Sequence, residues 1–251
     1  MKTKNRVVSI LAPIASFLLI FAIWEAACRI NEIPAWFLPM PSEIFKSMVV
    51  DFQEYWPHLL VTLQCVLIGF LIAIPVGLLI ATLITSFPLL NAAMSPYITF
   101  LVTTPLISLI PLLMLAMGYG MNMRITTVVI QSFAVINMNA CTGFNNVPTI
   151  RRELMQSVGA NRLQTYRMMI LPSAATDIIT GLRLAAIFAT TTCISVEYNA
   201  GNTGLGSQII KYSQYLQTTK SFACIFYVTV IGLIMYGLIA LIQKKIVTWQ
   251  E

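Results

Sequence analysis

Charged and polar side chains that could bind or react gather in one segment, residues 144–173, between two long apolar runs. Arg151, Arg152, Glu153 and Arg162 lie in this segment. Guanidinium and carboxylate groups form ion pairs and charge-assisted hydrogen bonds, so they suit recognition of a protein surface or of anionic lipid headgroups. On composition alone the segment is therefore either a docking element for a soluble partner or an amphipathic loop held to the lipid.

Catalytic chemistry has little support in this sequence. His58 is the single histidine, which argues against multi-histidine metal sites and most histidine-based catalysis. The chain contains no GxxxxGK[ST] phosphate loop, so it does not hydrolyse ATP itself. Its five cysteines form no CxxC pair, which favours buried, reduced thiols. We expect no catalytic residue and no metal site.

The composition is that of a membrane protein. Of the 251 residues, 58% are hydrophobic and 10% are charged, and the mean hydropathy is +0.82, whereas soluble domains carry about 25% charged residues. The net charge of +6 is therefore interpreted as a topology signal and not as a nucleic-acid-binding surface. Apolar runs long enough to cross a bilayer lie at residues 7–28, 59–85, 95–117, 123–143, 174–196 and 222–243.

These runs predict an all-α, polytopic membrane protein with about six transmembrane helices in a single domain, residues 1–251. Pro105 and Pro111 predict that the third helix is kinked and packed inside the bundle, because freed backbone groups must be satisfied by neighbouring helices or a cavity. An ordinary kink without a role in transport is the alternative.

The orientation follows from the basic residues, which concentrate in cytoplasmic loops. One set of loops and termini carries most of them: Lys2, Lys4, Arg6, Arg151, Arg152, Arg162, Arg167, Lys244 and Lys245. The alternate loops carry fewer: Arg29, Lys46, Arg124, Lys211 and Lys220. We expect both termini and the 144–173 segment to be cytoplasmic.

Within the polar segment the pattern predicts two short helices. The first begins at Pro148–Thr149 and ends at Gly159, because glycine takes the left-handed C-terminal position at low energy. The second is capped by Asn161 and stopped by Pro172 before the fifth membrane helix. The apolar positions that share a face are Ile150, Leu154 and Val158 in the first helix and Leu163, Tyr166 and Ile170 in the second.

The spacing of four residues in this segment resembles the cytoplasmic coupling loop of ABC importer permeases. That motif is Glu-Ala-Ala, three residues, Gly, nine residues, then Ile-x-Leu-Pro. Glu153, Gly159, Leu171 and Pro172 fall at the matching positions. Leu154 and Met155 replace the two alanines and Met169 replaces the isoleucine, which keeps helix propensity and adds bulk.

Other segments resemble the subgroup of nitrate, sulfonate and taurine importer permeases, and the resemblance covers roughly residues 35–245. The matching segments are Leu38-Pro39-Met40-Pro41-Ser42, Thr104-Pro105 to Pro111-Leu112, Gly181-Leu182-Arg183, and Glu197 followed by Gly204-Leu205-Gly206. The chain departs from the subgroup at Ala116-Met117-Gly118, where an aromatic Trp-Phe-Gly is frequent, and at Tyr198-Asn199, where a methionine is common.

The resemblance implies the type I ABC importer permease fold, in the plasma membrane of a prokaryote. It further implies a homodimer of permeases, two separate ATP-binding subunits that hold ATP and Mg²⁺, and an extracytoplasmic solute-binding protein, with no cofactor in this chain. The residues expected to dock the ATPase are Glu153, Leu154, Val158, Gly159, Ala160, Arg162, Leu171 and Pro172. Sulfonate-like, nitrate-like or taurine-like anions are the leading substrates, and a pyrimidine or similar heterocycle is the other candidate.

Polar residues inside the expected helices, and Glu197 just beyond the fifth, are candidates for the solute pathway: Asn137, Asn139, Arg183, Thr191, Ser195 and Glu197. Amides and hydroxyls suit a weakly binding route, and they also serve as ordinary hydrogen-bond partners between helices. Arg183 is either a structural arginine or a group that attracts an anionic substrate. Glu197 is expected at the start of an external loop, facing the binding protein or the turn at 201–206.

Three other classes of membrane protein compete with this interpretation. A stand-alone secondary transporter or channel would need buried charge relays or paired broken helices in an internal repeat, and no repeat is visible. An intramembrane serine protease would need a Ser and a His within the spans, and no GxSG motif exists. A vitamin-type importer component would carry a different arginine-containing signature in its coupling helices.

Overall fold

The computed structural model describes the backbone of residues 2–246 and the side chains of residues 11–199 and 201–245, so the side chains of Lys2, Lys4 and Arg6 lie outside the described residues. Throughout the described backbone the chain is helical and forms no strand, which confirms the all-α class. The helices are α1 (Lys2–Ile30), α2 (Pro41–Val50), α3 (Phe52–Ser86), α4 (Pro88–Thr103), η1 (Leu106–Leu109), α5 (Ile110–Met117), α6 (Met121–Asn145), α7 (Thr149–Ser157), α8 (Arg162–Thr165), η2 (Tyr166–Ile170), α9 (Leu171–Ser173), α10 (Ala175–Ala200), α11 (Leu205–Gln214) and α12 (Thr218–Ile246).

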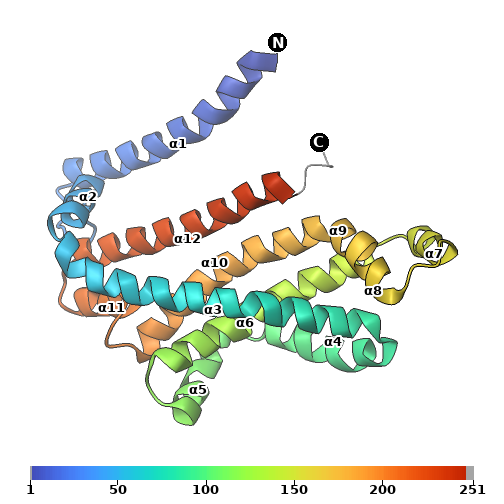
Figure 1. Ribbon diagram of the computed structural model, residues 1–251. Helices are drawn as coiled ribbons and strands as arrows, with labels where there is room; N and C mark the ends of the chain where they lie inside the picture. The colour runs from blue at the N-terminus through green and yellow to red at the C-terminus, as the bar shows by residue number, and fades with distance from the viewer. Residues whose placement is uncertain (1, 247–251) are drawn as a thin grey trace.

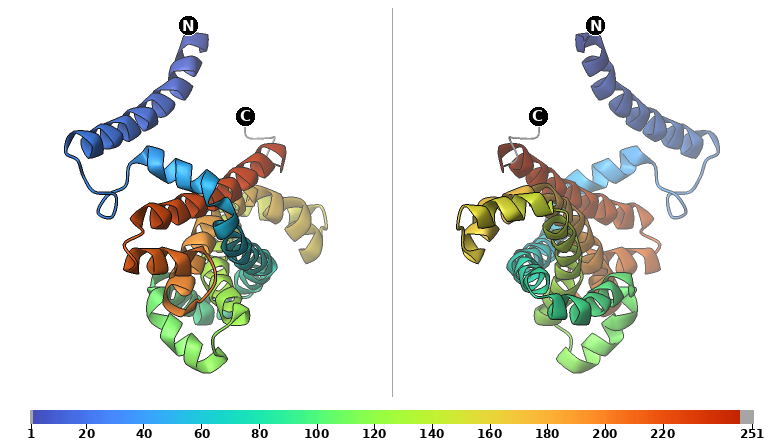
Figure 2. Two further views of the ribbon diagram at one scale, coloured as in Figure 1. Left: turned by 90° about the vertical axis from the view of Figure 1, so that its left-hand side faces the viewer. Right: turned by 90° about the vertical axis from the view of Figure 1, so that its right-hand side faces the viewer.

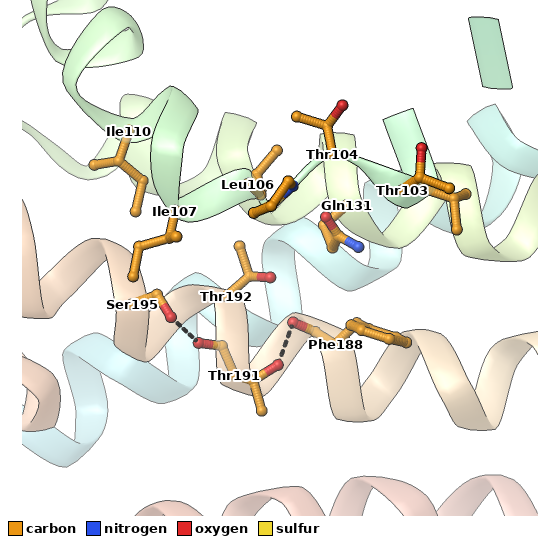
Figure 3. A pocket seen from close by; sticks show the side chains of 12 residues that line it. Thr103, Thr104, Leu106, Ile107, Ile110, Gln131, Phe188, Thr191, Thr192 and Ser195 are labelled. Atoms are coloured by element: carbon orange, nitrogen blue, oxygen red, sulfur yellow. Dashed lines mark hydrogen bonds between the residues drawn. The ribbon is translucent and has the colours of Figure 1, made fainter. Parts of the chain in front are cut away.

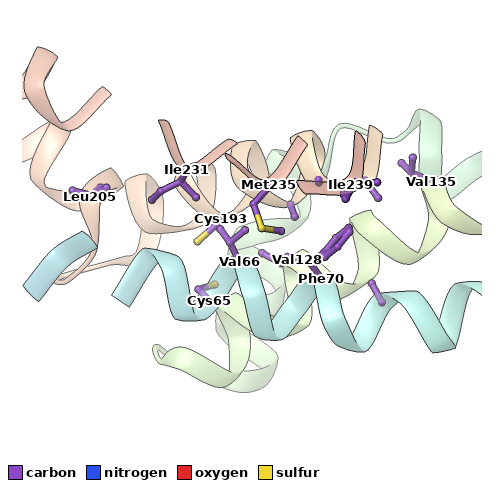
Figure 4. Packing of buried hydrophobic residues seen from close by; sticks show 14 of the residues in the cluster. Cys65, Val66, Phe70, Val128, Val135, Cys193, Leu205, Ile231, Met235 and Ile239 are labelled. Atoms are coloured by element: carbon purple, nitrogen blue, oxygen red, sulfur yellow. The ribbon is translucent and has the colours of Figure 1, made fainter. Parts of the chain in front are cut away.

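Three long helices, α3, α6 and α10, pack along one another and form the centre of the molecule, and α12 lies across α10 (Figure 1). The helix α1 reaches away from this bundle (Figure 2). Within its described side chains it contacts α2 and, through Phe21 and Trp24, the start of α12. Apolar side chains of α3, α6, α10 and α12 fill the interior, with Phe70, Val128 and Met235 in one continuous cluster (Figure 4).

The central helices approach closely because glycines stand at their contacts. A Cβ at Gly69 of α3 would lie 2.6 Å from Val128 Cγ1 of α6, and one at Gly181 of α10 would lie 2.6 Å from Asn139 Cβ of α6. Small residues at helix contacts let backbones approach in membrane bundles, where packing replaces the hydrophobic effect as the driving force. Gly181 belongs to the Gly-Leu-Arg segment of the subgroup resemblance, and close packing is its role here.

In the described chain five helices are long and apolar enough to cross a membrane, and the bent pair Pro88–Thr103 plus Leu106–Met117 makes a sixth span if counted as one. The two parts of that pair meet at 93°. The predicted kink is therefore confirmed. Its location is Thr104, which is extended because the residue before a proline is driven out of the helical region.

The prediction that this third span packs inside the bundle is wrong for the single chain. Ile98 is the one buried residue of α4, while Phe100 and Leu115 are 63% and 85% exposed. Pro111 causes no kink, because it stands in the first turn of α5, where a missing N–H breaks no hydrogen bond. The broken span covers one side of α6 and α10 and leaves its outer face free.

Candidate functional site

The polar segment forms the two short helices expected from its sequence, and both predicted signals are confirmed. Gly159 has φ +73°, and Ala160 N–H donates to the Met155 carbonyl at 3.0 Å, so the chain leaves α7 through a left-handed glycine turn. Asn161 begins α8 in a reciprocal capping box with Gln164. The turn directs α7 and α8 away from the membrane helices at one end of the bundle (Figure 1).

The apolar face of α7 is uncovered. Ile150, Leu154 and Val158 are 71%, 63% and 70% exposed, and Glu153 is exposed beside them. Leu163 of α8 is also exposed. Three aliphatic residues at helical spacing on a protruding helix form a surface that a partner helix groove or a lipid surface would cover.

The base of the segment is tied to the bundle. Arg152 Nη2 donates to the Phe144 carbonyl at 2.8 Å. The Tyr166 ring packs 5.7 Å from the Phe144 ring, and the hydroxyls of Tyr166 and Thr82 share a hydrogen bond of 2.7 Å. Tyr166 and Ile170 therefore face the core. Of the three residues predicted to form the apolar face of the second helix, Leu163 is the one left exposed to a partner. A cavity of about 300 Å³ remains at this base, lined in part by Ala160 and Arg162.

Pro172 does not stop the second helix, so that prediction is wrong. Residues Tyr166–Ile170 wind as a π-helical turn, and Pro172 occupies the first turn of α9, where a proline breaks no hydrogen bond. Apart from a turn at Ala174, the chain continues into α10. Leu171 is 37% exposed and Pro172 is half-buried, so both lie at the edge of the exposed surface.

Glu197 lies inside the protein and not at the start of a loop, because α10 extends to Ala200. Its side chain is fully buried. Thr62 Oγ1 donates to it at 2.9 Å, the Gly206 N–H donates at 2.9 Å, and Arg124 Nη1 lies 3.9 Å from Oε1. The carboxylate thus contacts the 201–206 turn, one of the two partners expected for it.

This buried network joins three helices to the segment ahead of α11. Thr62 Oγ1 also accepts from the Leu205 N–H at 2.9 Å, and Arg124 Nη1 donates to the Thr203 carbonyl at 2.9 Å. The sequence pattern predicted Arg124 in an external loop. The contact of Arg124 with a buried acid was predictable, because an arginine at the start of an apolar run needs an acidic partner inside the protein.

Two of the pathway candidates line a cavity of about 350 Å³ between α10 and the broken span α4–η1 (Figure 3). These are Thr191 and Ser195. Thr103, Thr104, Gln131 and Thr192 complete its polar lining. Sequence analysis missed Gln131, although an amide within the apolar run 123–143 was visible in the sequence.

The other candidates lie elsewhere. Asn137 is buried and donates to the Gly77 carbonyl at 3.2 Å, and Asn139 donates to the Val135 carbonyl of its own helix at 2.8 Å. The Arg183 guanidinium lies 5.4 Å from the centre of the Tyr236 ring, a cation–π contact. Asn137 and Arg183 thus join helices, Asn139 bonds within its own helix, and none of the three lines the cavity.

The chain matches the family described as "Binding-protein-dependent transport system inner membrane component" over residues 73–248, which is more than half of its length, and it belongs to that family. It is an ABC importer permease, a multi-pass membrane protein and a non-catalytic transport subunit.

Several relatives match nearly the whole chain. The formylaminopyrimidine transport permease protein ThiX of Halalkalibacterium halodurans is 27% identical, with 96% of each chain covered. The taurine transport system permease protein TauC of Escherichia coli is 24% identical, with 94% of this chain and 88% of that one covered. A putative aliphatic sulfonates permease, SsuC of Bacillus subtilis, is 26% identical, with 92% and 85% covered.

Solved structures share the fold. A chain of an amino acid ABC transporter superposes with a TM-score of 0.64 at 22% identity, covering 80% of this chain and 98% of that chain. A second, from the MetNI methionine ABC transporter, has a TM-score of 0.54 at 23% identity and covers 78% and 94%. These likenesses confirm the type I importer permease fold expected from the resemblance.

Proposed function

We propose that this chain, as a single transmembrane domain over residues 1–251, forms the translocation pathway of an ATP-driven importer in a prokaryotic plasma membrane. The observation that carries the proposal is the uncovered aliphatic face of α7, held out from the bundle by an anchored base. A protruding helix with exposed Ile150, Leu154 and Val158 needs a partner, and the coupling-loop motif on the same helix points to an ATP-binding subunit.

The docking surface comprises the face of α7 and the turn that follows it. Burying one exposed Leu, Ile or Val side chain stabilises a complex by about 1.5–3 kcal/mol, so three together are a substantial anchor. Glu153, Gly159, Ala160, Arg162, Leu171 and Pro172 surround these anchors at the contact. ATP and Mg²⁺ are then bound by two partner subunits, and this chain holds no cofactor.

A homodimer is supported by the outer faces of the broken span and of α10. Thr103 and Thr191 are polar and exposed there among apolar residues. Phe100 and Phe188 are 63% and 41% exposed beside them. Both hydroxyls donate to carbonyls of their own helices and keep free lone pairs that a solute could use. A second copy packed on this face would enclose the solute route between two equivalent helices.

The proposed orientation puts both termini and α7–α8 in the cytoplasm. The Trp36–Phe37 loop and the 201–204 turn then lie outside, where a solute-binding protein delivers the substrate. The substrate is a small solute. The relatives' names include taurine, aliphatic sulfonates and a formylaminopyrimidine, so sulfonate-, nitrate- or taurine-like anions and uncharged heterocycles are the two classes to compare.

Co-expression with candidate ATP-binding subunits, followed by affinity purification through the permease, tests the docking surface. The wild-type chain should retain an ATPase, and Leu154→Asp and Val158→Asp should lose it while the permease stays in the membrane. Gly159→Pro and Glu153→Arg should lose it as well, because one disrupts the turn and the other reverses a charge at the contact.

The matched control is Leu216→Asp. Leu216 is 63% exposed, as Leu154 is, but it follows α11 at the other end of the molecule, and aspartate tolerates its positive φ of 57°. This variant should retain the ATPase. Retention by the α7 variants, or no ATPase partner for the wild type, would contradict the proposal and favour a stand-alone transporter.

A further inference from the structure

The cavity between α10 and the broken span has an uncharged polar lining. Its volume is about 350 Å³, the size of pockets that hold small organic molecules. Hydroxyls come from both walls, and one amide, from α6, lies between them (Figure 3). The polar lining residues are Thr103, Thr104, Gln131, Thr191, Thr192 and Ser195, and the remainder are apolar. No acidic or basic side chain lines this cavity.

Gln131 is the unusual member of the lining. It is only 6% exposed, it faces the cavity from α6, and within the described part of the chain its amide has no hydrogen-bond partner. Figure 3 shows it between the Thr103–Leu106 segment of the broken span and the α10 side chains. The amide atoms are not fully enclosed, so they reach the open space of the cavity and can bond a group that enters it.

Thr192 repeats this feature on the opposite wall. It is 8% exposed and lines the cavity, and among the described residues its hydroxyl has no partner. The neighbouring hydroxyls differ, because Thr191 donates to the Ile187 carbonyl at 3.2 Å and Ser195 donates to the Thr191 carbonyl at 2.9 Å. Those two can therefore only accept from a ligand, whereas Gln131 and Thr192 can both donate and accept.

We propose that this cavity is a binding site for an uncharged, planar solute that presents a hydrogen-bond donor next to an acceptor, as an amide or an aminopyrimidine edge does. The Gln131 amide pairs with that edge through one donated and one accepted hydrogen bond. Thr192 supplies a further hydrogen bond, and the Phe188 ring, which lines the cavity, covers the apolar face of the solute. The inference rests on the proposed transport function and names its substrate class.

The charges of the surrounding residues argue against an anion at this site. An anion enclosed without a counter-charge loses its hydration and gains no ion pair in return. Arg183 and Arg124, which lie in the spans that flank the cavity, do not line it. Arg183 lies on the Tyr236 ring, and Arg124 binds the Thr203 carbonyl beside Glu197. An uncharged solute avoids this penalty, so the cavity discriminates against sulfonate and nitrate.

Binding to the full-length permease in lipid nanodiscs, measured by calorimetry and ligand-detected NMR, tests the site. The probes are cytosine, which is uncharged and carries the donor–acceptor edge, and methanesulfonate and nitrate, which are anions. Cytosine should bind more tightly than either anion. Gln131→Leu should weaken cytosine binding about tenfold or more, since two hydrogen bonds are lost, and Thr192→Val about threefold.

Thermal unfolding of the same samples separates recognition from a structural role. Gln131→Leu should leave the melting temperature unchanged, because its amide forms no hydrogen bond with the described part of the chain that the substitution would break. The control Gln53→Leu changes an exposed glutamine outside the cavity and should leave cytosine binding unchanged.

Three results would overturn the proposal: no cytosine binding, anion binding as tight as cytosine binding, or unchanged cytosine affinity in Gln131→Leu. The assay contains no ATPase. A permease that binds cytosine but retains no ATP-binding subunit would thus contradict the importer function and support the binding site. A permease that retains the ATP-binding subunit but does not bind cytosine would support the importer function and contradict the binding site.

Discussion

Glu197 shows how one buried side chain organises an end of this protein. Its carboxylate accepts hydrogen bonds from Thr62 of α3 and from the Gly206 backbone, beside Arg124 of α6. A buried charge is tolerated only when it is paired and hydrogen-bonded. Glu197 meets both conditions, and the result is that α3, α6, α10 and the start of α11 are held in one arrangement.

Replacing Glu197 by Gln should destabilise the protein by about 3 kcal/mol, because a buried ion pair loses one member and the new amide N–H₂ faces existing donors. The measurement is the melting temperature of the detergent-purified permease. The control Glu32→Gln makes the same chemical change at an exposed position and should leave the melting temperature within error. Equal melting temperatures for the two variants would show that the network is not important for stability.

Gly204 supports the same network through its backbone. Its φ is +103°, and a Cβ there would overlap the Glu197 carboxyl group. Gly204→Ala should therefore lower the melting temperature strongly. Gly237→Ala is the matched control, because a Cβ at Gly237 meets nothing within 4 Å and alanine favours a helix over glycine by about 1 kcal/mol. A Gly204→Ala variant as stable as Gly237→Ala would contradict this account.

At the scale of the helices, glycine contacts set the distance between α3 and α6. Gly69→Leu would insert a side chain where even a Cβ lies 2.6 Å from Val128, and overpacking of this kind costs about 1–3 kcal/mol or more. We expect a lower yield of folded protein, measured as the monodisperse fraction in size-exclusion chromatography. Gly237→Leu, on the open face of α12, should keep the wild-type yield.

Local signals in the sequence were sufficient for the helices of the polar segment. Gly159 and Asn161 act within a few residues of themselves, so their turn and cap were predictable from residue type alone. The expectation for Pro172 was wrong because residues Tyr166–Ile170 ahead of it wind as a π-helical turn, which has no pattern in the sequence.

The site residues were predicted less well, because their roles depend on contacts far apart in the chain. Hydropathy located the helix that carries Thr191, Ser195 and Glu197 but not which side of it faces a cavity. Glu197 meets Thr62 across 135 positions of sequence, and Gln131 faces α10 from a different helix. The third span was expected inside the bundle because its prolines and apolar residues suit burial. Its outer face is uncovered in the single chain, and only a second protein chain could bury it.

For the whole molecule, the orientation of the chain in the membrane is directly testable. Ser157 lies exposed in α7, and Leu216 lies exposed at the other end of the bundle. In intact cells a membrane-impermeant maleimide should label Leu216→Cys and not Ser157→Cys. Permeabilised cells should label both. Labelling of Ser157→Cys in intact cells would reverse the proposed topology.

The wild-type chain serves as the control for this experiment. Its cysteines Cys28, Cys65, Cys193 and Cys224 are buried, and Cys141 is half-buried. Background labelling of the unmodified protein should therefore be low in both intact and permeabilised cells.

The nearly unbroken helical path from Arg162 through α9 to Ala200 has a thermodynamic consequence. This path carries the end of the docking segment, the Thr191 and Ser195 wall of the cavity, and Glu197. If occupancy of the cavity favours one position of α10, it changes the affinity of the cytoplasmic surface for its partner by some factor. Linkage then requires that the partner change the affinity of the cavity by the same factor. The binding of solute and the binding of ATPase would thus be coupled through a single helix, without contact between the two partners.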